Sequence, residues 1–152
     1  ALFAMIGYLN KNNLKPKYRT LLAFPLYEEI GHGGAYVPPE VSEYVALDIG
    51  LIGPDYHADE KTVSICAKDN YSPYDRELTT RIINQAKKTN LNYCVDVFFH
   101  YGTDANAAIR AGNNVYAAAF GMAVINSHGK ERCHIDSIVD TTKLAIAYAL
   151  DL

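Results

Sequence analysis

The chain has 152 residues, of which 49% are hydrophobic and 20% charged, and its formal net charge is −3 at pH 7. This composition is typical of one globular domain with an apolar core, and it excludes a disordered or fibrous chain. The charge gives no reason to expect a nucleic acid or an anionic membrane as partner, and no apolar stretch approaches the roughly 18 residues of a membrane span. Three cysteines without a C-x-x-C pair argue against a disulfide framework and favour a reducing, cytoplasmic location.

The first half of the chain is predicted to contain one helix and three strands. The helix is expected over residues 1–13, where Gly7 is the only helix breaker. An apolar run at 18–24, stopped by a proline, predicts a strand buried on both faces. The segments 43–49 and 61–67 are predicted to form two more strands.

Helices and strands alternate in the second half: helix 75–90, strand 92–99, helix 103–112, strand 114–121 and helix 136–150. Thr103 and Asp136 are expected to cap the last two helices at their N-termini, and Gly112 to end the shorter one. Strands that alternate with helices indicate an α/β fold. We therefore expect a three-layer αβα sandwich around a mostly parallel, mixed sheet.

Acids and histidines follow the predicted strands. Glu28 and Glu29 come after the first strand, Asp48 closes the second, and the loops 100–104 and 126–134 follow the last two. In such sheets ligands bind beyond the carboxyl ends of the strands. The four segments are therefore expected to converge on one site.

Carboxylates gathered in a partly buried cleft repel one another unless a cation compensates their charge. Carboxylates together with histidine are a normal ligand set for zinc or cobalt. Because adjacent residues of an extended chain point in opposite directions, Glu28 and Glu29 cannot both easily face one ion. A division of labour fits better, in which one glutamate binds metal and the other handles the proton of a water activated there.

Four motifs carry a resemblance to a known family: "EEIGHGGA" at 28–35, "ALDIG" at 46–50, "GTDANAAIRAG" at 102–112 and "ERCHIDSI" at 131–138. Their order and approximate spacing resemble the glutamyl-aminopeptidase, or tetrahedral aminopeptidase, family of dinuclear metallopeptidases, which are often labelled cellulase or endoglucanase. The similarity extends from Leu21 to Ala149. It implies a metal-dependent aminopeptidase that acts on peptides with a free amino terminus.

The resemblance also implies roles for individual residues. Glu28 would be the general base, Glu29 and His134 would bind one metal, and Asp48 would bind the other. The two ions would be zinc or cobalt, and the enzyme would form a homo-oligomer. The substrate cleft would be lined by Gly102, Thr103, Asp104 and His128, with a plain loop histidine as the alternative for His128.

Two departures from the family pattern bear on this interpretation. After the two glutamates the family usually reads like Gly-Leu-Arg-Gly, whereas here His32 stands within Gly31–Gly34. The family also needs an upstream histidine ligand and an upstream aspartate that bridges the metals. Residues 1–152 are therefore expected to form the second part of one catalytic domain, without the upstream part and its inserted dimerisation domain. By itself the chain is expected to bind metal weakly, to be inactive and to associate.

Two other functions stay open at this point. Paired carboxylates could serve a glycoside hydrolase, as the family's common label suggests. The chain has no tryptophan for a sugar platform, however, and Asp48 and His134 would have no role. The third possibility is a non-catalytic assembly module that kept the fold and lost the metals.

Overall fold

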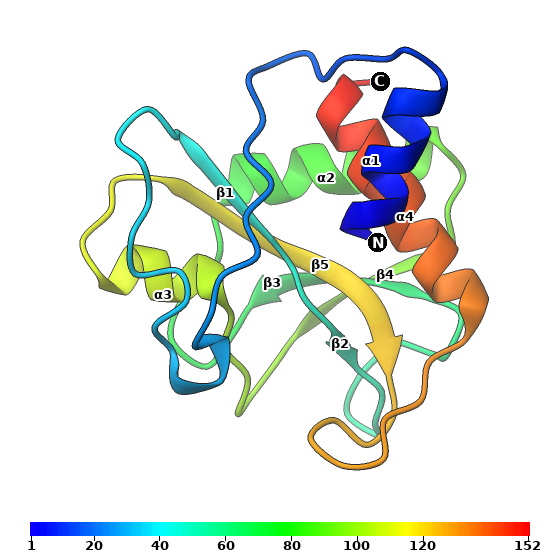
Figure 1. Ribbon diagram of the computed structural model, residues 1–152. Coiled ribbons are helices and arrows are strands. Elements are labelled where there is room, and N and C mark those ends of the chain that lie inside the picture. Colours follow the sequence, from blue (N-terminus) through cyan, green and yellow to red (C-terminus); the bar gives the residue numbers. More distant parts are fainter.

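The computed structural model describes all residues 1–152 and contains four α-helices, one short 3₁₀-helix and five strands (Figure 1). In chain order these are α1 (Leu2–Lys11), η1 (Glu28–Ile30), β1 (Glu43–Leu47), β2 (Gly50–Leu51), β3 (Val63–Lys68), α2 (Arg76–Lys88), β4 (Tyr93–Val97), α3 (Asp104–Arg110), β5 (Tyr116–Val124) and α4 (Ile135–Leu150). None of the helices is long and apolar enough to span a membrane.

The strands form one sheet in the order β1-β5-β3-β4, and β2 extends the pairing of β1 along β5. The pairs β1·β5, β2·β5 and β3·β4 are parallel, whereas β3 and β5 are antiparallel. The predicted mixed, mostly parallel sheet is confirmed. Because the strand direction reverses between β5 and β3, the carboxyl ends of β1 and β5 point to one end of the sheet and those of β3 and β4 to the other.

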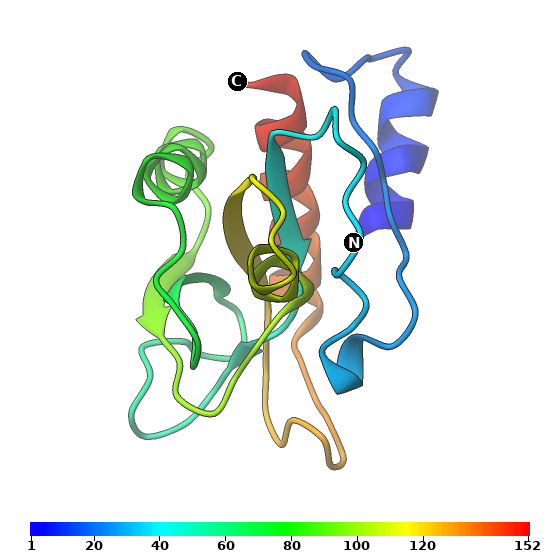
Figure 2. The same cartoon turned by 90° about the vertical axis from the view of Figure 1, so that its left-hand side faces the viewer.

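Helices cover both faces of the sheet. α2 and α4 pack on one face and α3 on the other, while α1 lies beside α4 (Figure 2). Strand β5 contributes to the core on both faces of the sheet, because alternate residues of a strand face opposite sides. Its Ala118 and Phe120 belong to the core under α2 and α4, and its Ala117 and Ala119 to the core under α3. The three-layer αβα architecture is confirmed.

The predicted strand at 18–24 is wrong. This segment has no regular structure, and Tyr18 and Phe24 are 69% and 54% exposed. Phe24 stacks on Phe3, with ring centroids 4.9 Å apart, while β1 pairs only with β5. An apolar run can indicate burial, but it cannot indicate whether a neighbouring strand is available to pair with.

The helix ends agree with the sequence except at α4. Thr103 caps α3 by accepting from the N–H of Asn106 at 3.5 Å, and Gly112 follows α3 with a φ of +90°. At α4 the cap is His134, whose Nδ1 accepts from the N–H of Asp136 at 3.1 Å. The prediction that Asp136 is the cap is wrong, since it lies in the first turn, where its charge favours the helix dipole.

Candidate active site

Glu28 and Glu29 lie in the tight turn η1. Tyr27 before the turn and Gly31 after it both have left-handed backbones, and the Gly31 N–H donates to the Glu28 carbonyl at 2.8 Å. Successive side chains of a 3₁₀-helix are about 120° apart, so the expected alternation of an extended chain does not apply. The two acids still have different surroundings, because Glu28 is half-buried and the Glu29 side chain is 75% exposed.

Asp48 lies at the junction of β1 and β2. Its N–H donates to the carbonyl of Phe120 at 3.2 Å, and its Oδ1 accepts from the Ile49 N–H at 2.7 Å. The neighbouring position on β5 has to be glycine, because a Cβ on Gly121 would lie 1.4 Å from the Asp48 carbonyl oxygen. The Tyr101 hydroxyl donates to the carbonyl of Ile49, the residue after Asp48, at 2.5 Å.

Asp104 begins α3 and lies against the glycines that follow η1. A Cβ on Gly34 would come within 2.0 Å of the Asp104 carbonyl oxygen, and a Cβ on Gly33 within 2.6 Å of Asp104 Oδ1. Asp104 is only 8% exposed, and its Oδ1 is buried without a hydrogen-bond partner. The segment 31–34 therefore lies directly on the start of α3, and this contact brings η1 to Asp104.

The acids of these three elements influence one another. Burial raises the pKa of Glu28 to about 7, and the charges of Asp48, Asp104 and Glu29 add to the effect. Burial likewise raises the pKa of Asp48 to about 6, against the lowering effect of the Ile49 N–H and with smaller additions from the charges of Asp104 and Glu29. The pKa of Asp104 is raised by burial. Perturbed carboxyl groups that share a partly buried site are characteristic of functional sites.

His128 approaches this group of acids from the loop between β5 and α4. Its Nε2 lies 3.6 Å from Glu29 Oε2, and its backbone N–H donates to Glu131 Oε1 at 3.0 Å. The charge of His128 works against the raised pKa values of Glu28 and Asp48. The structure thus brings together four acids and His128.

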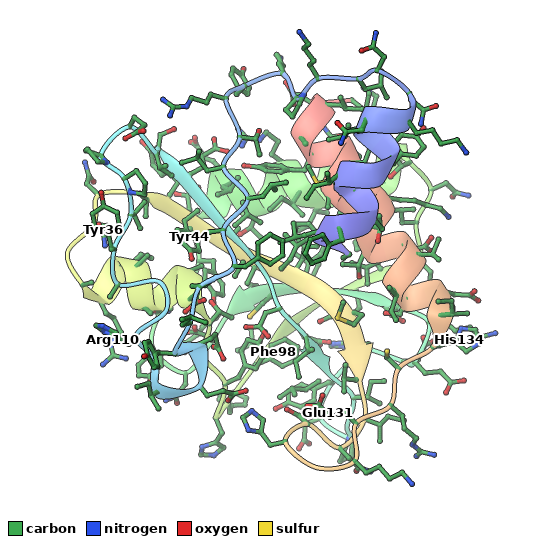
Figure 3. The ribbon with its side chains drawn as sticks, viewed as in Figure 1. Tyr36, Tyr44, Phe98, Arg110, Glu131 and His134 are labelled. Carbon is green, nitrogen blue, oxygen red and sulfur yellow. The ribbon has the colours of Figure 1, made fainter.

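His134 lies elsewhere. Figure 3 shows it at the start of α4, on the other side of the molecule from η1. Its Nδ1 accepts from the Asp136 N–H, and its own N–H donates to the carbonyl of Glu60 at 3.3 Å. The expectation that Glu29, Asp48 and His134 lie within reach of shared ions is not met in this structure.

The strand directions do not account for the position of His134, because β1 and β5 are parallel and Asp48 and the loop 126–134 both follow carboxyl ends at the same side of the sheet. The rule that polar residues meet beyond the carboxyl ends of the strands holds for parallel strands. Because β5 is antiparallel to β3, the loop after β5 and the loop after β4 leave the sheet at opposite edges. Only the tip of the long loop after β5, which carries His128, reaches the acids that the loop after β4 approaches.

The side chains of this site are of the types that bind a divalent cation, but too few of them are placed around one point to hold it. Carboxylate and imidazole groups are suitable ligands for zinc or cobalt, and the buried, unpaired Oδ1 of Asp104 and the raised pKa values of Glu28 and Asp48 are what uncompensated acids show. No three His, Cys, Asp or Glu side chains are placed to hold one ion, however, and about three protein ligands are usual for a catalytic zinc. The acids of this site do not by themselves make up the ligand set of a catalytic zinc.

Known proteins are similar to this chain in sequence and in fold. The sequence model of the M42 glutamyl aminopeptidase family matches residues 1–144. YhfE of Bacillus subtilis (strain 168), which is named as a candidate aminopeptidase, is 36% identical over 148 residues, which cover 97% of this chain and 43% of YhfE. This protein therefore belongs to the M42 glutamyl aminopeptidase family, and the chain spans less than half the length of this relative.

Solved structures agree on the fold. A TET aminopeptidase from Thaumarchaeota archaeon SCGC AB-539-E09 matches with a TM-score of 0.75 at 16% identity, over 99% of this chain and 45% of that one. The TET1 peptidase of Pyrococcus horikoshii, which can assemble into a tetrahedron or a large octahedral shell, matches with a TM-score of 0.68 at 24% identity, over 80% and 38% of the two chains. The predicted family and fold are confirmed.

Sequence reasoning missed several residues that shape the site. Gly33, Gly34 and Gly121 matter because a backbone or a carboxylate touches them, and Tyr101 because its hydroxyl reaches Ile49. None of these contacts has a signal in spacing or composition. The motif "GHGG" at 31–34 was visible in the sequence, but the residue it packs against was not.

Proposed function

We propose that the full protein to which this chain belongs is a metal-dependent aminopeptidase that removes N-terminal residues from peptides in the cytoplasm. Residues 1–152 would be the second part of its catalytic domain, and the protein would act as a homo-oligomer. The observation that carries the proposal is the half-buried Glu28, whose pKa is raised to about 7 by burial and by the nearby charges of Asp48 and Asp104. The chain that contains it belongs to a peptidase family.

Glu28 suits the role of general base. A carboxyl group with a pKa of about 7 is ionised in part of the molecules at neutral pH, so it can take a proton from the attacking water and return it to the leaving amine. An unshifted glutamate is a much weaker base, and a proton transferred to it is harder to retain. Burial of Glu28 beside other acids is thus the feature that adapts it to this task.

Glu29 and Asp48 would each hold one of two divalent ions, zinc or cobalt. The role of His134 as a further ligand beside Glu29 is proposed from its "ERCH" motif alone, since the structure places His134 away from η1. When bound, such ions lower the pKa of water and polarise a scissile carbonyl. The loop of Gly102, Thr103 and Asp104 would orient the peptide with His128. The remaining ligands would come from parts of the protein outside residues 1–152.

The function is tested on the full-length protein with leucyl, lysyl and glutamyl chromogenic substrates and their N-acetylated counterparts. We expect hydrolysis only where the amino terminus is free, loss of activity with a chelator, and recovery with zinc or cobalt. Hydrolysis of a soluble glucan that resists the chelator would favour a glycosidase instead. A protein with neither activity would favour the assembly module.

The roles of the two histidines can be distinguished by the metal content of variants that lack one or the other. In the full-length protein, His134→Ala should lower the zinc retained after dialysis, while His128→Ala should keep it and raise KM. The reverse result would assign the ligand role to His128, which is the histidine nearest the acids in this structure. Metal content measured by atomic absorption and KM on one leucyl substrate are sufficient to distinguish these cases.

A further inference from the structure

A buried carboxylate lies behind the site and takes no part in the chemistry described so far. Asp69, at the end of β3, is 0% exposed. Its Oδ1 accepts from the N–H groups of Tyr71 and Ser72 at 2.8 and 3.1 Å and from Asn106 Nδ2 at 2.7 Å, and its Oδ2 accepts from the Tyr74 hydroxyl at 2.9 Å. A buried carboxylate needs either a cation or several hydrogen-bond donors, and these four donors satisfy the carboxylate of Asp69.

The hydrogen bonds of Asp69 continue to the start of α3. The Tyr74 hydroxyl lies 2.7 Å from Thr103 Oγ1, and Thr103 is the residue that caps α3. Asn106, in the first turn of α3, donates to Ser72 Oγ at 3.1 Å as well as to Asp69. Two separate paths therefore connect the end of β3 with the first turn of α3.

The first turn of α3 in turn determines where η1 lies. Asp104 follows Thr103 directly, and its carbonyl oxygen and carboxylate leave no room for a Cβ on Gly34 or Gly33. The backbone of Gly34 lowers the pKa of Asp104 against the effect of burial, which agrees with this close approach. These glycines follow η1 within four residues, so a shift of Asp104 would be transmitted to Glu28.

We propose that Asp69, Tyr74 and Asn106 are positioning residues that hold Glu28 and Glu29 in place through the Thr103–Asp104 turn. The proposal rests on the proposed function only in the role of the two glutamates, since the mechanical connection is a property of the fold. Asp69 touches neither glutamate, and it acts through a chain of contacts from β3 to α3 to the segment 31–34.

The connection is tested by hydrogen–deuterium exchange on the full-length protein with Tyr74→Phe, which removes one hydroxyl and keeps the ring. Peptides spanning residues 26–36 and 101–108 should exchange about 5- to 10-fold faster, because one buried hydrogen bond is lost. Peptides of β5 and α4 should exchange as in the wild type. The matched control is Tyr93→Phe, a half-buried tyrosine on β4 outside these contacts, which should leave both peptides unchanged.

A second variant approaches the same contact from α3. Asn106→Asp keeps the size of the side chain and suits the first turn of a helix, but it places a second carboxylate against Asp69. It should accelerate exchange in the same two peptides. In both variants kcat should fall about 10-fold, while KM and metal content stay within about twofold of the wild type.

Two results would overturn the proposal. Faster exchange spread evenly over all peptides would show that the Asp69 contacts contribute only to global stability. A Tyr74→Phe protein that behaves like Tyr93→Phe would show that the contacts do not reach η1. If the wild type hydrolyses no aminoacyl substrate, the proposed function fails, and the exchange pattern still decides whether the segment 26–36 depends on Tyr74.

Discussion

The central sheet with its helices and the segment that joins α1 to β1 are two very different regions. In the sheet Val63 and Ile65 are 0% exposed, and residues of α2 and α4 pack against them. In the joining segment, residues 12–42, the only regular element is η1, and Leu26 and Ile30 are 73% and 75% exposed. The proposed base therefore lies in the less well packed of the two regions.

The joining segment is held at a few places. The Lys17 N–H donates to the carbonyl of Ala149, Phe24 stacks on Phe3, and the glycines after η1 lie on Asp104. Such a segment contributes little buried apolar area and can open locally while the sheet stays folded. Stability and activity should therefore respond to different mutations, and each of the following predictions tests that separation.

Glu28→Gln in the full-length protein should have the largest effect. A neutral amide cannot accept the proton of water, so turnover should fall about 10²- to 10⁴-fold, the usual contribution of a general base. Unfolding by urea and metal content should stay close to those of the wild type. Glu77→Gln, the same change on α2, is the matched control. Full peptidase activity in Glu28→Gln would refute the role of Glu28.

Two isoleucines compare the regions directly. Ile82 on α2 is 0% exposed, so Ile82→Ala should lower the free energy of unfolding by about 2–5 kcal/mol through lost burial and a cavity. Ile30 at the end of η1 is 75% exposed, and Ile30→Ala should change it by less than about 0.5 kcal/mol. Urea denaturation of both variants measures the contrast. Equal losses at the two positions would mean that the segment is as well packed as the sheet.

Two glycines test how each region tolerates crowding. Gly121→Ala would place a methyl group 1.4 Å from the Asp48 carbonyl oxygen inside the sheet, and we expect a loss of about 1–3 kcal/mol in stability. Gly34→Ala would meet the Asp104 carbonyl oxygen at 2.0 Å, but one side of that contact is the joining segment, which is less well packed than the sheet. The joining segment should shift away from Asp104, so Gly34→Ala should lose less stability and more turnover than Gly121→Ala. Thermal unfolding and kcat on the same samples separate the two outcomes.

The difference between the regions also explains what the sequence could predict. The strands and helices of the sheet were found because Val63, Ile65 and Ile82 belong to apolar patterns with a clear period. The run 18–24 was wrongly predicted as a strand for the same reason. Its composition resembles that of a buried strand, but no neighbouring strand pairs with it. Periodicity describes which residues are apolar and says nothing about which strand lies beside them.

The candidate site was predicted in its residues but not in its geometry. The motif resemblance pointed to Glu28, Glu29, Asp48 and Asp104, and the structure does bring these acids together. The position of His134 at the start of α4, away from η1, has no signature in the motif that contains it. The glycine contacts with Asp104 depend on long-range packing, and no local pattern contains that information.

The smallest predicted effect is a dependence of stability on pH that comes from the acids of the site. In the metal-free protein the pKa values of Glu28 and Asp48 are about 7 and about 6, against ordinary values of 4.5 and 3.8. Between the ordinary and the raised values the folded protein binds protons that the unfolded chain has released. The stability that these two protons provide is complete at low pH and is lost as the pH rises through the raised values.

The free energy of unfolding should therefore fall between about pH 4 and pH 7, the reverse of what a carboxylate in a salt bridge contributes. Asp48→Asn removes one of the two groups and should flatten this slope, as measured by urea denaturation with a chelator at several pH values. Asp140→Asn, the same change at a surface ion pair with Lys143 on α4, should leave the slope as it is. A slope that is equal in Asp48→Asn and the wild type would mean that Asp48 is solvated like an ordinary surface acid. In that case the joining segment would lie farther from the sheet in solution than its contact with Asp104 indicates.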